Sequence, residues 1–360
     1  MKKYKIDKYL SELDIENILE PNCVNLIISS TGSGKTRALL DLAGRNKTVA
    51  FVAPFVSITS QLAEQYDNLE KVKGMVALGE QAITADGRVC SFHSIPRLLE
   101  LKNIDILVID EIHYLPNYAG FTRGMLTTFW ATLMELKNKH PEMKIVALTA
   151  TPQFIRLYTP FDFNEIFISP TQVLSKPAKI EVKSTFRNDI DRYSSYLFLY
   201  DSKKNGAAKA RNFNGHFISS DNKETSPAYY DILQGRLPAD KPRIFTSTVL
   251  STGISITDPV DYVYTHWLSL SDIVQTAARP RQGGHILRVQ KCIPWHIQKQ
   301  GMLDEPLLNW SGDFEKDMKL LNQWTEFYSW AVQMSGFETI HDVIYQLFWA
   351  PEKDLPNITY

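Results

Sequence analysis

The sequence predicts an α/β protein made of two successive lobes, each with a parallel β-sheet flanked by helices. Short apolar runs alternate with helix-like stretches through the first 155 residues, and the same alternation returns in the second half. The length of 360 residues is also enough for two domains. We expect lobe 1 over residues 1–158, lobe 2 over 159–298 and a short helical C-terminal extension over 299–360.

The strands and helices expected in lobe 1 follow from two kinds of apolar pattern. Short runs rich in β-branched residues predict buried strands at residues 24–29, 48–53, 104–110 and 144–149. Longer stretches with apolar residues three to four positions apart predict helices at residues 36–44, 57–66, 94–101 and 124–139. Strands that alternate with helices in this way pair in parallel, since each helix carries the chain back across the sheet.

Lobe 2 begins after a connection rich in Pro and Ser near residues 159–179. Residues 201–215 are rich in Gly, Ala, Asn and Lys and predict a flexible loop. The same patterns as in lobe 1 predict strands at 215–220, 243–248, 261–267 and 285–290, and helices at 227–235 and 271–280.

Composition places the chain among globular proteins. Its 39 Lys and Arg balance 40 Asp and Glu, and 44% of its residues are hydrophobic, which excludes disordered, collagen-like and disulfide-stapled classes. The balance argues against a purely electrostatic nucleic-acid binder, although residues 171–215 carry nine basic and four acidic residues. That stretch is either a solvated surface or an auxiliary nucleic-acid contact. The sequence has no long apolar run, no signal-peptide core and no closely spaced cysteines. We therefore expect a reducing cytoplasm and no membrane contact.

The strongest motif is a phosphate-binding loop directly after the strand at 24–29. Glycines in a tight loop let backbone N–H groups approach phosphate oxygens, and the following helix N-terminus favours negative charge. The lysine of such a loop reaches the β- and γ-phosphates, and the hydroxyl after it holds Mg²⁺. A chance glycine-rich loop is the alternative, which the strand–loop–helix setting disfavours. The expected nucleotide-binding residues are Thr31, Gly32, Ser33, Gly34, Lys35 and Thr36, with Ser29 where the strict pattern has glycine.

A second motif ends the apolar strand at 104–110. Asp110 and Glu111 deliver two carboxylates to the carboxyl end of that strand, where ligands bind in open α/β sheets. We expect Asp110 to hold the metal together with Thr36, and Glu111 to orient or deprotonate the attacking water. Two acids after a strand also fit an ordinary turn. Because they follow the loop lysine, Lys35, by seventy-five residues, the two acids predict nucleotide hydrolysis.

In this order, the motifs resemble those of the superfamily 2 helicases and translocases. Asp110-Glu111-Ile112-His113 resembles their D-E-x-H box, and Thr149-Ala150-Thr151 resembles motif III. The resemblance covers residues 24–290 and implies two RecA-like lobes, coupled through His113, Thr149 and Thr151. Further matches are Ala53-Pro54-Phe55 with Gln61 for motif Ia, Ser91-Phe92-His93-Ser94 for the strand-end motif that touches nucleic acid, and Thr246-Ser247-Thr248 with Gly253-Ile254 for motif V, whose glycine lies beside the nucleotide.

Residues 275–281, Gln-Thr-Ala-Ala-Arg-Pro-Arg, resemble motif VI but depart from the common Q-x-x-G-R-x-x-R. Ala278 replaces the glycine, and Arg281 comes two rather than three residues after Arg279. This spacing is closer to that of viral origin-binding-type and some phage helicases. The resemblance implies catalytic roles for Gln275, Arg279 and Arg281, with Arg281 as the arginine finger and Arg279 assisting. Surface salt bridges are the alternative for both arginines.

Six small residues near expected strand ends are candidates for gripping the nucleic-acid backbone. Hydroxyls and backbone amides at such positions contact phosphates without reading bases. Helix capping is the alternative for each hydroxyl. The candidates are Pro54, Ser57, Ser94, Ser219, Ser247 and Thr248.

The pattern as a whole predicts an ATP-dependent nucleic-acid helicase or translocase that uses ATP and Mg²⁺. The resemblance implies single-stranded or branched DNA as the track, in phage or mobile-element replication, recombination or repair, within the bacterial host cytoplasm for a phage protein. Recognition of a specific origin or junction then needs a partner protein. Residues 1–28 contain no glutamine, so the adenine-reading Q-motif of DEAD-box RNA helicases is absent. Two alternatives stay open: an RNA helicase, and an ATP-gated DNA-binding clamp or recruitment factor that does not unwind.

Overall fold

The structure is a computed structural model, and through residue 290 its described chain divides into two compact units between Gln172 and Val173. The helical extension expected at 299–360 lies outside the described residues apart from Lys316, as does most of the helix expected at 57–66. Each unit is an α/β domain of parallel strands flanked by helices, which confirms the predicted fold class. The described residues are 2–42, 47–55, 58–59, 62, 69–71, 87–115, 125–152, 155, 159, 162–183, 193–199, 203–247, 250, 254–265, 270–290 and 316.

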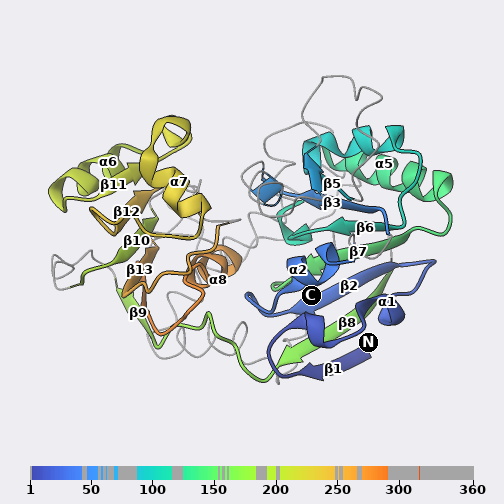
Figure 1. Cartoon of the computed structure of the whole chain (residues 1–360), viewed down its shortest axis with the longest axis horizontal. Coiled ribbons are helices and arrows are strands. Elements are labelled where there is room, and N and C mark those ends of the chain that lie inside the picture. The colour runs from blue at the N-terminus through green and yellow to red at the C-terminus, as the bar shows by residue number, and fades with distance from the viewer. Residues whose placement is uncertain are drawn as a thin grey trace. The chain divides into compact units, whose positions relative to one another are not determined.

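The described part of the first unit holds a sheet of eight strands, all parallel to their neighbours (Figure 1). The four strands predicted from apolar runs lie at its centre, and their side chains are almost entirely buried. In spatial order the strands are β1 (Lys2–Ile6), β8 (Phe163–Pro170), β2 (Val24–Ser29), β7 (Lys144–Thr149), β6 (Ile106–Ile109), β3 (Val49–Ala53), β5 (Gly87–Ser91) and β4 (Leu69–Lys71).

Strand β8 corrects the expected lobe boundary at residue 158. Residues 163–170 belong to the expected connection, but they pair with both β1 and β2 inside the first sheet. Polar residues such as Asn164 and Glu165 lie among its apolar residues, which hides the strand from a search for apolar runs. The first unit therefore extends to Gln172.

Helices of the first unit pack around this sheet. The core against one set of helices includes Leu39, Leu40 and the strand residues Ile27, Phe51 and Val108. The regular helix expected at 94–101 is instead part of a 3-10 helix that contains Pro96. In an α-helix the proline ring would clash with the carbonyl four residues earlier. The helices are α1 (Ile15–Ile18), α2 (Lys35–Leu40) and α5 (Met125–Lys139), with 3-10 helices η1 (Leu10–Glu12), η4 (Phe92–Glu100) and η5 (Ile112–Tyr114).

The second unit, as far as it is described, holds a parallel sheet of six strands. Strands were predicted at four of these positions, and helices were predicted at the positions of α7 and α8. The strands are, in spatial order, β11 (His216–Ile218), β12 (Arg243–Thr246), β10 (Tyr196–Leu199), β13 (Tyr262–Thr265), β14 (Ile286–Gln290) and β9 (Lys179–Lys183). The helices are α6 (Lys203–Asn212), α7 (Pro227–Leu233), α8 (Leu270–Ala277) and the 3-10 helix η8 (Lys223–Thr225).

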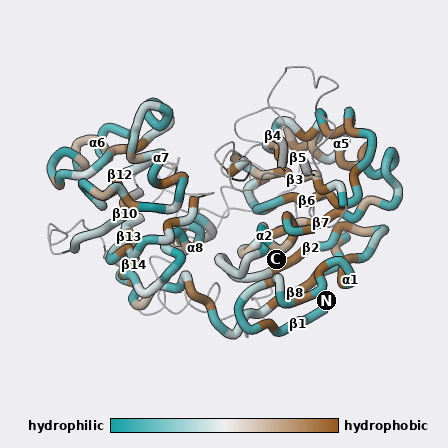
Figure 2. The backbone as a smooth tube through the Cα atoms, viewed as in Figure 1, coloured by the Kyte–Doolittle hydropathy of each residue, from teal (hydrophilic) through white to brown (hydrophobic). Residues whose placement is uncertain are grey.

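The two faces of this second sheet have different cores. Helices α7 and α8 pack with aliphatic strand residues such as Leu197, Ile244 and Val263. Helix α6 packs with the aromatic side chains that alternate with these aliphatic residues along the strands. Figure 2 shows hydrophobic residues on the strands of both units. The aromatic set comprises Tyr196, Phe198, Phe245, Tyr262 and Tyr264.

Helix α6 replaces the flexible loop expected at residues 201–215, so that prediction was wrong. Its small residues serve packing: a Cβ at Gly206 would lie 2.6 Å from the Phe217 ring, and Ala210 is buried. Alanine is also the best helix former. The small residues that we took as a sign of a flexible loop let the helix approach the sheet closely. No described helix is long and apolar enough to cross a bilayer.

A buried ion pair joins β9 to β14 in the second unit. Arg288 is 2% exposed and donates from its Nε and Nη2 atoms to Glu181 Oε2, at 3.1 and 2.6 Å. Although burial raises the pKa of Glu181, hydrogen bonds from Lys179 and Arg288 hold it below its usual value. The carboxylate therefore stays ionised beside the buried guanidinium.

We expect Glu181→Gln to lower the free energy of unfolding by about 3 kcal/mol, because it replaces the carboxylate that accepts both bonds of the buried Arg288 guanidinium by a neutral amide. Urea denaturation followed by circular dichroism measures this. Lys179→Ala is the matched control: this lysine contacts the same carboxylate from an exposed position, so its loss is expected to change stability by less than about 1 kcal/mol. Equal effects of the two substitutions would contradict a special role for the buried pair.

Candidate functional site

The phosphate loop connects the end of β2 to the start of α2. Gly32 and Gly34 have φ angles of 80° and 77°, a left-handed conformation that glycine adopts without strain. Ser29, which stands where the strict pattern has glycine, donates from its hydroxyl to the Ser33 hydroxyl across the loop at 3.0 Å. The departure from the strict pattern therefore adds a bond within the loop.

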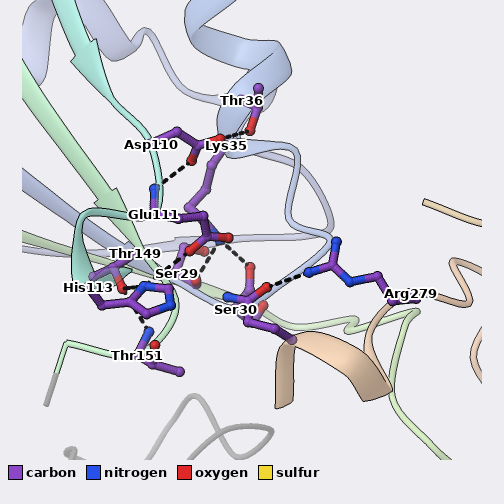
Figure 3. A network of polar contacts seen from close by, with 11 residues as sticks. Ser29, Ser30, Lys35, Thr36, Asp110, Glu111, His113, Thr149, Thr151 and Arg279 are labelled. Carbon is purple, nitrogen blue, oxygen red and sulfur yellow. Dashed lines mark hydrogen bonds and ion pairs between the residues drawn. The ribbon is translucent and has the colours of Figure 1, made fainter. Parts of the chain in front are cut away.

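Lys35 is buried inside this loop at 7% exposure. Its Nζ donates to the backbone carbonyls of Ser29 and Ser30, both at 2.9 Å (Figure 3). The ammonium is thus held by the loop itself at the carboxyl edge of the sheet. A lysine fixed at a glycine-containing loop between a strand and a helix is the arrangement that binds a polyphosphate.

Asp110 and Thr36 meet beside the loop. The Thr36 hydroxyl donates to Asp110 Oδ2 at 3.2 Å, and the backbone N–H of Glu111 donates to Asp110 Oδ1 at 3.0 Å. Burial, and then the negative charge of Glu111, raises the pKa of Asp110 to about 7. A hydroxyl and a buried carboxylate next to a phosphate loop are hard oxygen ligands of the kind that Mg²⁺ prefers. These two residues fit a magnesium ion that is shared with a nucleotide.

Glu111 has an unusual backbone conformation directly after β6. Its φ of 46° and ψ of 47° lie in the left-handed region, which is strained for a residue with a side chain. Such strain is retained where the surrounding structure enforces it, and it clusters at functional sites. The turn places Glu111 Oε2 3.3 Å from His113 Nδ1 and keeps the carboxylate in the network of Figure 3.

A polar chain leads from this turn to the end of β7. His113 Nδ1 and Thr149 Oγ1 are hydrogen-bonded at 3.0 Å, and the backbone N–H of Thr151 donates to the same hydroxyl at 3.0 Å. The three residues expected to couple hydrolysis to movement are therefore linked to one another, and His113 links them to Glu111.

The motif VI residues lie in the second unit. Arg279 is buried, and it donates from Nη1 to the Ile254 carbonyl at 2.9 Å and from Nη2 to Gln275 Oε1 at 3.1 Å. Arg281 donates from Nε and Nη2 to the hydroxyl of Ser255, at 2.9 and 2.6 Å. Sequence reasoning missed Ser255, because its role depends on the strand-like pairing of Ile256 with Pro280.

The described candidates for nucleic-acid contact follow the ends of strands. Pro54 follows β3, Ser219 follows β11 and Ser247 follows β12, while Ser94 lies in η4 just after β5. Ser219 is also engaged locally, since its backbone N–H donates to Asn222 Oδ1 at 2.7 Å. The remaining expected residues, Ser57, Gln61, Thr248 and Gly253, lie outside the described residues.

The buried His285 leads us to expect that the stability of the second unit depends on pH. Burial lowers its pKa from the usual 6.5 to about 4. Between these values the unfolded chain binds a proton that the folded chain does not, so folding stability falls as the pH drops from about 6.5 to about 4. We expect His285→Leu to remove about 2 kcal/mol of the stability difference between about pH 7 and pH 4.5 in urea titrations. An unchanged difference would contradict this origin.

Comparison with known proteins agrees with the geometry of the first unit. Residues 3–154 match the family described as type III restriction enzyme, res subunit. Over these residues the chain is similar to a superfamily 2 helicase-type domain with a RecA-like fold. No curated protein matches the chain.

Proposed function

We propose that the protein is an ATP-dependent nucleic-acid helicase or translocase of superfamily 2 that acts on DNA. One observation carries the proposal: a phosphate loop with a buried lysine, a hydroxyl–carboxylate pair and a strained glutamate form one network at the carboxyl edge of a parallel sheet. The family match over residues 3–154 supports the same kind of ATPase domain.

The roles of the residues follow from their chemistry. Backbone amides of the loop and Lys35 bind the β- and γ-phosphates. Thr36 and Asp110 would hold Mg²⁺, which would supply positive charge next to the phosphates. Glu111 accepts a proton from the attacking water or orients it, and its contact with His113 keeps the carboxylate turned into the site. A motor of this kind needs no covalent intermediate, because positioning and charge supply most of the catalysis.

Arg281 and Arg279 are proposed to stabilise charge that develops on the γ-phosphate, with Arg281 as the principal arginine. The bonds of Arg281 to Ser255, and of Arg279 to Gln275, hold each guanidinium in a defined orientation within its unit. The His113–Thr149–Thr151 chain is proposed to transmit the state of the nucleotide to the rest of the protein.

The proposed track is single-stranded or branched DNA in phage or mobile-element replication, recombination or repair. Residues such as Pro54, Ser94, Ser219 and Ser247 are proposed to grip the phosphate backbone, which gives movement without base recognition. Selection of an origin or junction is assigned to a partner protein.

Strand displacement distinguishes this proposal from its alternatives. The full chain is mixed with ATP, Mg²⁺ and fluorescent forked DNA, with end-bound streptavidin on single-stranded DNA as a second track. We expect the protein to separate the fork or remove the streptavidin, and Lys35→Ala to do neither. ATP turnover with DNA binding but no displacement would favour the clamp instead. Displacement only on RNA tracks would replace DNA by RNA.

A further inference from the structure

Helix α6 carries a concentration of positive charge on the flank of the second unit. It lies beside β11, the outermost strand in the order given above (Figure 1). One side of the helix is packed on the sheet, since Gly206 lies against the Phe217 ring and Ala210 is buried. This packing fixes the orientation of the cations on the other side. The helix contains no acidic residue, and its basic residues are Lys203, Lys204, Lys209 and Arg211.

Two of these four cations have partners within the unit. Lys203 Nζ donates to Asp221 Oδ1 at 2.6 Å, just after β11. Lys209 Nζ lies 5.8 Å from the centroid of the Phe213 ring, which is the distance of a cation–π contact. Contacts inside the protein therefore account for these two side chains.

The other two cations lie on the outward side of the helix, which we call the α6 ridge and define by Lys204, Ala208 and Arg211. Lys204 and Arg211 are exposed, and neither side chain has an ion-pair or hydrogen-bond partner among the residues that the structure describes. Seven residues are close to two helical turns, so the two cations lie on the same side of the helix, about 10 Å apart along its axis. The small side chain of Ala208 lies between them and leaves both accessible to a surface laid along the helix.

Helix stability does not explain the charge of Lys204. This lysine lies in the first turn of α6, where the helix dipole favours negative side chains and disfavours positive ones. Arg211 lies in the last turn, the end at which a cation is favourable. A polyanion bound along the ridge would supply the negative charge that the first turn lacks.

The chemistry of the ridge favours the phosphate backbone of a duplex. Helix α6 contains no aromatic residue, whereas sites for single strands combine cations with aromatic rings on which unpaired bases stack. A duplex carries one negative charge for about every 1.7 Å of its axis, and cations bind it by releasing condensed counterions, whatever its sequence. A rigid helix with two cations on one side suits this dense and regular array of charge.

From these observations we propose that the α6 ridge binds the phosphate backbone of double-stranded DNA. The contact is separate from the strand-end residues that are proposed to grip the track. The inference rests on the proposed nucleic-acid motor and adds a binding surface for the paired part of a branched track. Of the two alternatives for the basic stretch at residues 171–215, it selects the auxiliary nucleic-acid contact.

Equilibrium binding of the full chain to a fluorescent blunt DNA duplex, and to a single strand of the same length, tests this over a range of salt concentrations. We expect the Lys204→Gln/Arg211→Gln double variant to bind the duplex about tenfold more weakly at moderate salt. The slope of log affinity against log salt should fall by about two, because each lost phosphate contact removes about 0.9. Binding to the single strand is expected to change by less than about threefold. Thermal unfolding should match that of the parent, since glutamine is a good helix former.

Lys102→Gln/Arg236→Gln is the matched control, since it removes one exposed lysine and one exposed arginine outside α6 and should leave duplex binding unchanged. Parent-like duplex affinity and salt slope in the α6 double variant would overturn the inference and leave the ridge as a solvated surface. Equal weakening of duplex and single strand would overturn it too, because α6 would then belong to the grip on the single strand, as would a parent that binds the single strand alone. A parent that binds neither form of DNA would instead contradict the proposed function itself.

Discussion

Lys35→Ala is expected to lower the rate of ATP hydrolysis by about a thousandfold or more while the first unit keeps its fold, because a fixed cation on the transferred phosphate stabilises the transition state. The side chain is buried, yet its bonds are to loop carbonyls rather than to the apolar core. Phosphate release measured with saturating ATP, beside circular dichroism and thermal unfolding, separates lost chemistry from lost structure.

Lys137→Ala is the matched control for this prediction. Lys137 also donates to backbone carbonyls of the first unit, those of Pro21, Pro141 and Met143 at 2.7, 2.6 and 2.9 Å. Its loss removes lysine–carbonyl bonds without touching the loop, so hydrolysis per folded molecule should persist. Parent-like turnover by Lys35→Ala would refute the assignment of the phosphate loop.

Glu111→Gln is expected to bind ATP as the parent does and to hydrolyse it about a hundredfold to a thousandfold more slowly. Glutamine keeps the shape and the contact with His113 but cannot take a proton from water. The variant should therefore remain on nucleic acid in the presence of ATP for longer than the parent. Single-turnover hydrolysis and a nucleotide binding titration measure the two effects separately.

Glu135→Gln provides the control, since Glu135 lies exposed on α5, away from the network. It should behave like the parent in both assays. Should Glu111→Gln hydrolyse ATP at the parent rate, another group must orient the water, and the strained backbone at Glu111 would need a different explanation.

The central strands could be predicted because they are buried on both faces. Strands β2, β3, β6 and β7 are runs of apolar, often β-branched residues, a pattern that few other structures produce. Strand β9 alternates charged and apolar residues, Lys179-Ile180-Glu181-Val182-Lys183, and looks like a surface segment in the sequence. Its buried Glu181 pairs with Arg288, 107 residues later, which the local sequence does not indicate. A strand of this kind can be identified only when its pairing partners are known.

The functional site divides in the same way. The loop at Lys35 and the acids at 110–111 are local patterns whose spacing carries the chemistry, so the sequence is enough to locate them. Ser255 carries no such pattern. Its bond with Arg281 depends on the pairing of Ile256 with Pro280. Contacts that arise from tertiary structure were missed for that reason.

Steady-state ATP hydrolysis by the full chain, with and without nucleic acid at one fixed salt concentration, tests the central claim most directly. Single-stranded, duplex and forked DNA and RNA are compared, with Lys35→Ala as the background. If the protein is a nucleic-acid-dependent motor, its ATP hydrolysis depends on Lys35. The rate then rises about tenfold or more with a DNA track, since release of counterions draws the protein onto the strand. Hydrolysis that no nucleic acid stimulates, or none under any condition despite bound ATP, would contradict it.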